Sequence, residues 1–216
     1  MKEIFQLVKK DFQIDSRQKY PIAGIVLYIF ATIYISYLAF QSLITPGTWN
    51  ALIWIILLFA SVTGISKSFI QEDNRSLYYF FLVKPHHVFT AKLLYSLLYE
   101  IVLILISVIL FKVFLGFPVK NQGLFVLMLF IGGLGIACSF TLISSLAAKS
   151  ENQSTMMAIL GFPVVIPVLV LAVTNSRKIV LGADWGDVSG NTLTLLSVNV
   201  IIVSVAYILF PYSWRN

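Results

Sequence analysis

Six apolar stretches, each long enough to cross a lipid bilayer, dominate this 216-residue chain. Each holds 18 to 25 residues, and Glu100 is the only charged residue in any of them. About 20 helical residues cross the hydrocarbon core of a bilayer. Backbone in lipid must satisfy its own hydrogen bonds, which leaves helices or a closed barrel, and runs this long without two-residue alternation exclude the barrel. The sequence therefore predicts an all-α integral membrane protein with six transmembrane helices, at about 21–43, 49–66, 93–111, 124–148, 155–174 and 192–212.

The composition leaves no room for a folded soluble domain beside these helices. Hydrophobic residues make up 59% of the chain and charged residues 11%, far from the balance of a soluble domain. We therefore expect a single transmembrane domain over residues 1–216. Any chemistry that needs a soluble domain must come from another chain.

The positive charges predict the orientation of the helices in the membrane. With the N-terminus inside, eleven Lys and Arg residues fall on the inner side and four on the outer side. Positive residues accumulate on the cytoplasmic side of membrane proteins, so both termini are expected in the cytoplasm. The net charge of +6 then reflects topology, and we expect no nucleic-acid partner.

Residues 1–20, before the first apolar stretch, have the pattern of an amphipathic helix. Ile4, Phe5, Val8 and Phe12 recur at helical spacing, and lysines and glutamines occupy the other face. This pattern favours an interfacial helix with its lysines toward anionic lipid. The alternative is a frayed basic tail that only sets the topology.

The connector over residues 67–92, between the second and third apolar stretches, is rich in aromatic residues. Its start is charged, yet Tyr78, Tyr79, Phe80 and Phe81 follow one another directly. Exposed aromatic residues rimmed by charge are typical of a docking surface. The alternative is a segment lying on the bilayer surface. Ser76 could begin a short helix within the connector, and Pro85 could end it.

Glu100 lies roughly 12 Å along the third apolar helix from Lys92, at 1.5 Å per residue. A carboxylate at that depth is costly, so it should face protein or water and find a partner. Lys67, near the inner end of the second stretch, is one candidate for a structural ion pair. The alternative is a contact with a substrate or a proton in a translocation path.

Two further features bear on the shape of the helices. Pro163 and Pro167 each remove an intrahelical hydrogen bond, so the fifth helix should be kinked or broken. Such a break either lines a cavity, as in transporters, or is simply packed. In the fourth stretch, Gly132, Gly133 and Gly135 supply the small residues that let helices approach closely.

The sequence lacks the motifs of the common membrane enzymes. There is no Gly-x-x-x-x-Gly-Lys-Ser/Thr motif, so the chain cannot cradle ATP phosphates in that manner. The only histidines, His86 and His87, lack metal-ligand spacing, and we predict neither a metal site nor catalytic residues.

The chain resembles the CcmB family, the membrane subunit (haem exporter protein B) of the cytochrome c maturation ABC transporter. In the family's second connector a Phe is followed by acidic residues, Ser-Leu, a proline and Ala-Lys. Here these positions are Phe69, Glu72, Asp73, Ser76, Leu77, Pro85, Ala91 and Lys92. The family's Leu-Pro-x-x-Ile-Pro stretch is similar to residues 162–167.

The resemblance implies a permease subunit in a bacterial cytoplasmic membrane, with ATP hydrolysis in a separate CcmA-like subunit. Its aromatic connector, including Leu77, Tyr78, Phe80 and Phe81, would receive force from that ATPase. Further implied partners are a CcmC-like haem-handling membrane protein, a CcmE-like haem chaperone and a second copy of the chain. The complex would handle haem, either by delivering it or by releasing the haem-loaded chaperone. Two alternatives stay open at this point: an ABC-2 type exporter permease for lipid, glycan or drug, which shares the six-span architecture, and a non-transporting membrane scaffold.

Overall fold

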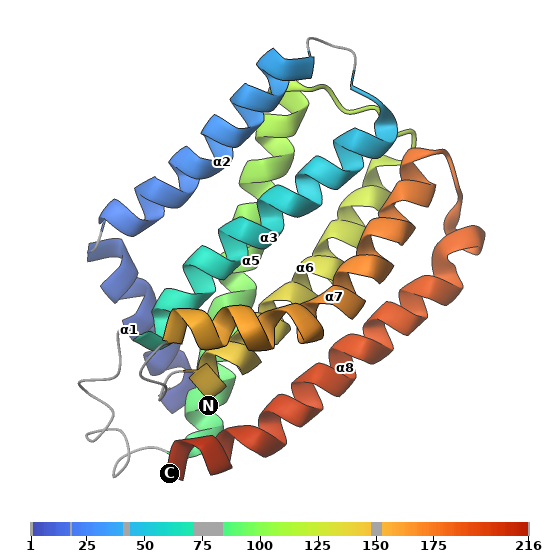
Figure 1. Cartoon of the computed structure of the whole chain (residues 1–216). Helices are drawn as coiled ribbons and strands as arrows, with labels where there is room; N and C mark the ends of the chain where they lie inside the picture. Colours follow the sequence, from blue (N-terminus) through green and yellow to red (C-terminus); the bar gives the residue numbers. More distant parts are fainter. Residues whose placement is uncertain (1, 18, 41–43, 71–83, 148–152, 216) are drawn as a thin grey trace.

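The computed structural model describes residues 2–17, 19–40, 44–70, 84–147 and 153–215, and helices make up nearly all of them. The described helices are α1 (Lys2–Arg17), α2 (Lys19–Phe40), α3 (Pro46–Ile70), α5 (Pro85–Phe114), α6 (Gln122–Ala147), α7 (Gln153–Val180) and α8 (Trp185–Arg215). Six of them, all but α1, are long and apolar enough to cross a membrane. Figure 1 shows these six as a bundle with both chain ends at the same end of it. The predicted all-α architecture with six transmembrane helices is confirmed.

Several helix boundaries differ from the prediction. α5 begins at Pro85 and not near residue 93, so Pro85 starts a helix where we expected it to end one. α7 continues to Val180 and α8 already begins at Trp185. Both helices thus extend into the segment between the fifth and sixth predicted spans, and only four residues, 181–184, join α7 to α8.

The short α7–α8 connection has a specific local cause. The Gly182 N–H donates to the Ile179 carbonyl and the Ala183 N–H to the Lys178 carbonyl, both at 3.0 Å. This is the Schellman pattern, which needs a left-handed residue after the helix, and Gly182 has φ +99°. Asp184 then precedes α8, and the Asp187 carboxylate accepts from the Asp184 N–H at 3.3 Å, as in a capping box. The chain reverses within one turn.

Two other helices begin with recognisable caps. The Thr48 N–H donates to Thr45 Oγ1 at 3.2 Å, with Pro46 at the first helical position of α3. The Leu124 N–H donates to Asn121 Oδ1 at 3.2 Å at the start of α6. These polar groups satisfy backbone donors that a helix start leaves without partners.

α6 forms the centre of the bundle. In its spanning segment 72% of the residues are buried, against 22 to 50% in the other five spanning helices. A Cβ at Gly132 would overlap Trp54 on α3, and a Cβ at Gly135 would overlap Asn199 on α8. Gly133 faces α5 in the same way. The predicted role of these glycines in close helix approach is confirmed, and each serves a different neighbour.

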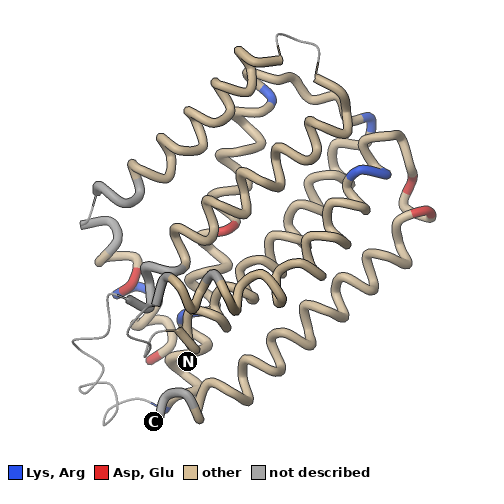
Figure 2. The backbone as a smooth tube through the Cα atoms, viewed as in Figure 1, with Lys and Arg blue, Asp and Glu red and all other residues tan. Residues whose placement is uncertain are grey.

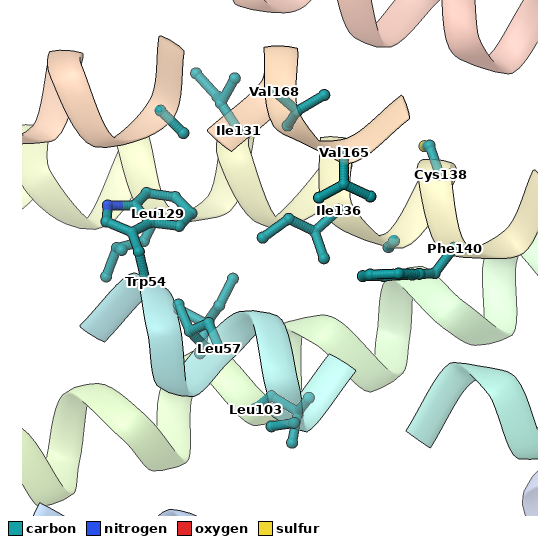
Figure 3. Packing of buried hydrophobic residues seen from close by; sticks show 14 of the residues in the cluster. Trp54, Leu57, Leu103, Leu129, Ile131, Ile136, Cys138, Phe140, Val165 and Val168 are labelled. Atoms are coloured by element: carbon teal, nitrogen blue, oxygen red, sulfur yellow. The ribbon is translucent and has the colours of Figure 1, made fainter. Parts of the chain in front are cut away.

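The core around α6 combines apolar packing with hydrogen bonds between helices. Figure 3 shows apolar side chains of several helices, Trp54 and Leu57 among them, filling the space beside α6. The Trp54 Nε1–H also donates to Ser176 Oγ at 2.8 Å, and Asn199 Nδ2 donates to the Ile131 carbonyl at 3.0 Å. Because lipid is as apolar as the core, such packing and hydrogen bonds hold membrane helices together.

Candidate functional site at the base of the bundle

The connector between α3 and α5 leaves and rejoins the bundle at the end that carries both chain termini. Figure 1 shows α1, the end of α3, the start of α5 and the end of α8 gathered there. We call this part of the molecule the basal region, and define it as residues 2–17, 66–70, 85–92 and 207–212. Lys84, directly before α5, is extended with ψ 138°, and Pro85 occupies the first turn of α5.

A buried ion pair joins α1 to α5 within the basal region. Lys92 Nζ lies 3.1 Å from Asp11 Oδ2, and the two side chains are 3% and 7% exposed. Lys10 Nζ lies 3.3 Å from the other carboxylate oxygen of Asp11. Two charges removed from water need good mutual geometry, and the loss of one partner typically costs about 3–5 kcal/mol. The pair therefore fixes where α1 sits on α5.

A second polar contact joins the two helices one turn nearer the connector. His87 Nδ1 lies 2.8 Å from Glu3 Oε2, and both side chains are partly open to solvent. Exposed pairs of this kind contribute at most about 1 kcal/mol. The contact thus helps to set the register of α1 and adds little to its stability.

The opposite side of the α5 start packs on the end of α8. The His86 ring stacks on Tyr207 with centroids 4.4 Å apart. Phe89 lies on Phe210 with centroids 5.2 Å apart, and both phenylalanines are buried. Aromatic pairs of this kind add about 0.5–1.5 kcal/mol beyond their buried area. The first two turns of α5 are thus held between α1 and α8.

Apart from one acidic position in the middle of the bundle, the charged residues that the structure describes lie toward the two ends of the helices, as Figure 2 shows. The basal end carries the α1 lysines and Lys84, while Lys112, Lys120, Arg177 and Lys178 belong to the opposite end. This separation agrees with the unequal distribution of Lys and Arg along the sequence.

α1 is a helix, as predicted, but its apolar residues do not all share one role. Ile4 and Val8 are half-buried on the side of Asp11, whereas Phe5 and Phe12 are 71% and 64% exposed. The frayed-tail alternative is wrong for residues 2–17. Placement of α1 in the lipid headgroup layer stays a prediction.

Most of the predicted coupling connector lies outside the described residues. This applies to Glu72, Asp73, Ser76, Leu77, Tyr78, Phe80 and Phe81. Phe69 is in the last turn of α3, with its side chain also outside the described part. Pro85 is described, and it lies at the point where the connector becomes α5.

The other predicted site residues lie away from the base. Glu100 is buried near the middle of α5, where Ser61 on α3 is its described hydrogen-bond partner at 2.5 Å. The side chain of the predicted partner Lys67 is outside the described part. Pro163 and Pro167 are both exposed, within an α7 that stays helical through them. Figure 1 shows α7 changing direction along its length, so the helix is bent and not broken.

Sequence reasoning missed Asp11 and Tyr207 as parts of the basal region. A signal for Asp11 was present, because it follows Ile4 and Val8 at helical spacing and so shares their inward face. An acidic residue on the apolar side of an amphipathic helix predicts a buried cation nearby. No comparable signal marks Tyr207, since the residues directly before and after it in α8, Ala206 and Ile208, are apolar.

A bundle of six spanning helices with a basal helix packed against it defines a multi-pass membrane protein. The family model described as CcmB protein matches residues 2–215, and the chain belongs to the CcmB family. It is accordingly a membrane subunit of the haem-exporting ABC transporter for cytochrome c maturation, and it acts with the other subunits of that complex. A search of curated proteins found no match.

Proposed function

We propose that this permease subunit couples ATP hydrolysis by a separate CcmA-like subunit to haem delivery or to release of a haem-loaded chaperone. The coupling element is the connector from Phe69 to Pro85. Its proposed contact residues are Phe69, Glu72, Asp73, Ser76, Leu77, Tyr78, Phe80, Phe81 and Pro85.

The observation that carries this proposal is the way α5 begins. The connector runs directly into α5 at Pro85, and the next two turns are fixed to α1 by the Asp11–Lys92 pair and to α8 by the aromatic contacts. A force applied to the connector would therefore reach three helices at once. A loosely attached connector would absorb the same force within itself.

The proposal includes an orientation and a set of partners. The termini lie in the cytoplasm of a bacterial inner membrane, so that the basal region faces the ATPase. A CcmC-like membrane protein and a CcmE-like chaperone handle haem beside this subunit, and two copies of the chain form the permease. Membership of the CcmB family favours this proposal over an exporter of lipid, glycan or drug and over a passive scaffold.

The docking role of the connector is tested by Phe80→Ser combined with Phe81→Ser. A buried aromatic anchor can contribute about 2 kcal/mol to an interface, and about 1.4 kcal/mol is a factor of ten in affinity. We expect the ATPase to be lost from the complex after mild detergent extraction, while the variant inserts normally. The measurement is co-purification of the ATPase with the tagged membrane subunit.

The matched control removes two aromatic residues at the opposite end. Tyr34 and Tyr37 on α2 are 42% and 43% exposed, and Tyr34→Ser with Tyr37→Ser likewise replaces two aromatic rings by serine. This variant should retain the ATPase at the wild-type yield. Retention of the ATPase by the Phe80/Phe81 variant would place the docking site elsewhere.

A further inference from the structure

The side chain of Glu100 lies at a junction of three helices deep in the bundle. It is 2% exposed, near the midpoint of α5, and its carboxyl group points to Ser61 on α3. On the side of α6 it meets backbone, because a Cβ at Gly133 would lie 3.1 Å from Glu100 Cγ and 3.3 Å from Oε1. The side chains of Ile104 and Glu100 together fill the space that Gly133 leaves open.

The hydrogen bonds around Ser61 require a proton on Glu100. Ser61 Oγ lies 2.6 Å from the Leu57 carbonyl oxygen and 2.5 Å from Glu100 Oε2. Two oxygen atoms this close need a hydrogen between them, so the two contacts need two hydrogens. The Ser61 hydroxyl brings one and the Leu57 carbonyl brings none. The second hydrogen must come from the carboxyl group, which then donates to Ser61 while Ser61 donates to Leu57.

The surroundings of the Glu100 carboxyl group also favour its protonated, neutral form. Glu100 Oε1 is buried without a hydrogen-bond partner in the described structure. A buried polar atom of this kind costs far less in a neutral acid than in an ionised one. On its own helix, Lys92 lies two turns away and is paired with Asp11 at 3.1 Å.

The other two helices offer little to balance a negative charge at this place. The sequence of α6 contains no charged residue. In α3 the only charged residue is Lys67, six residues beyond Ser61, or about 9 Å along the helix.

From this geometry we infer that Glu100 is a proton-binding site in the centre of the membrane domain, and that its neutral acid form joins α5 to α3. The chain of donors runs from Glu100 to Ser61 and on to the Leu57 carbonyl. The two helices joined in this way are the same two that the connector links at the base. The connector and the Glu100–Ser61 hydrogen bond therefore link α3 and α5 at two levels, and the hydrogen-bonded link carries no net charge.

Substitutions at Glu100 can distinguish a protonated, neutral Glu100 from an ionised one. Gln has the same length, cannot ionise and can donate from its amide to Ser61, so Glu100→Gln should melt at the wild-type temperature in detergent. Glu100→Ala removes the bond and leaves a cavity, and its Tm should fall by about 4 °C or more. Lys67→Met, which removes the alternative cation, should leave Tm unchanged.

Infrared spectroscopy of the intact chain gives a second readout that does not depend on folding of the Ala variant. The difference spectrum of wild type minus Glu100→Gln at neutral pH should contain the C=O stretch of a protonated acid. Ser61→Ala should shift that band, because the acid loses its acceptor. A carboxylate band in place of the acid band would overturn the inference. So would a Glu100→Gln variant that melts as low as Glu100→Ala, or a Lys67→Met variant that is equally unstable.

Discussion

Single glycines and single polar side chains decide how closely the helices of this domain approach. Gly132, Gly133 and Gly135 lie on the buried α6, and each leaves space that a side chain from another helix occupies. Their spacing predicted close packing, but a single sequence carries no information on which neighbour each glycine meets. The partner depends on the rotation of α6 within the bundle, and that is set by all its contacts together.

Gly132→Ala should destabilise the domain. The added Cβ would overlap the Trp54 ring and lie 2.9 Å from Cβ of Ala172, and both neighbours are buried. Overpacking of this kind typically costs about 1–3 kcal/mol. Thermal unfolding in detergent should show a lower Tm than wild type.

Gly123→Ala is the matched control on the same helix, because a Cβ there meets nothing within 4 Å. Gly123 lies in the first turn of α6, where an added methyl group meets no neighbour, so this variant should be as stable as wild type. Equal melting of the two variants would show that α6 has room at Gly132.

At the scale of whole helices, the sequence predicted the elements well and their ends poorly. Hydrophobic length identified every spanning helix, because the bilayer imposes that length. The ends depend on local chemistry: the left-handed Gly182 and the Asp184–Asp187 cap shorten the α7–α8 connection, and Pro85 starts α5. These signals were present in the sequence, but hydrophobicity alone places such ends in loops.

The Asp11–Lys92 pair should hold α1 on α5. Asp11→Asn leaves the buried Lys92 without this carboxylate, at about 3–5 kcal/mol. Lys92→Met should cost less, because Lys10 Nζ still lies 3.3 Å from the Asp11 carboxylate. The double variant should be less damaged than the sum of the two, since it leaves no isolated charge. Amide hydrogen exchange should rise first in residues 2–17, because local opening precedes global unfolding.

Lys9→Met is the control for this cycle, because Lys9 is an exposed cation on the same helix. It should leave exchange in α1 unchanged. Strict additivity of the two single substitutions would mean that the pair does not act as a unit.

The bend in α7 should be required for function and not merely tolerated. Leucine at both Pro163 and Pro167 restores two intrahelical hydrogen bonds and straightens the helix. Both positions are exposed, so the new side chains face away from the core of the bundle. Leucine is favourable in such a lipid-facing position. The double variant should accumulate and retain its ATPase, yet fail to support holocytochrome c formation in cells.

The control for the proline variant is Phe162→Leu combined with Ile166→Leu, which changes the neighbouring exposed side chains and leaves both prolines in place. It should support normal cytochrome c levels. Normal levels in cells carrying only the Pro163/Pro167 variant would show that the bend is a matter of packing.

At the scale of the whole molecule, the contacts that form the basal region could not be predicted from the sequence. The sequence marked its connector by aromatic content, but the contacts that brace α5 come from residues as far apart as Glu3 and Tyr207. Pairings between distant segments follow from the packing of the complete bundle. The charge asymmetry, in contrast, is additive along the chain, and eleven positive residues against four predict the orientation directly.

The orientation is tested by cysteine labelling in a Cys138→Ala background, which removes the single native cysteine. Ser176 would be a poor reporter because it is buried against Trp54. Gly186 is exposed at the start of α8, and a Cβ added there would meet nothing within 4 Å, while Gln6 is exposed on α1 at the other end. The proposed topology predicts that Gly186→Cys reacts with an impermeant reagent in intact cells, whereas Gln6→Cys reacts only after permeabilisation. The reverse pattern would place the basal region outside, away from any cytoplasmic ATPase, and would contradict the coupling function as well as the topology.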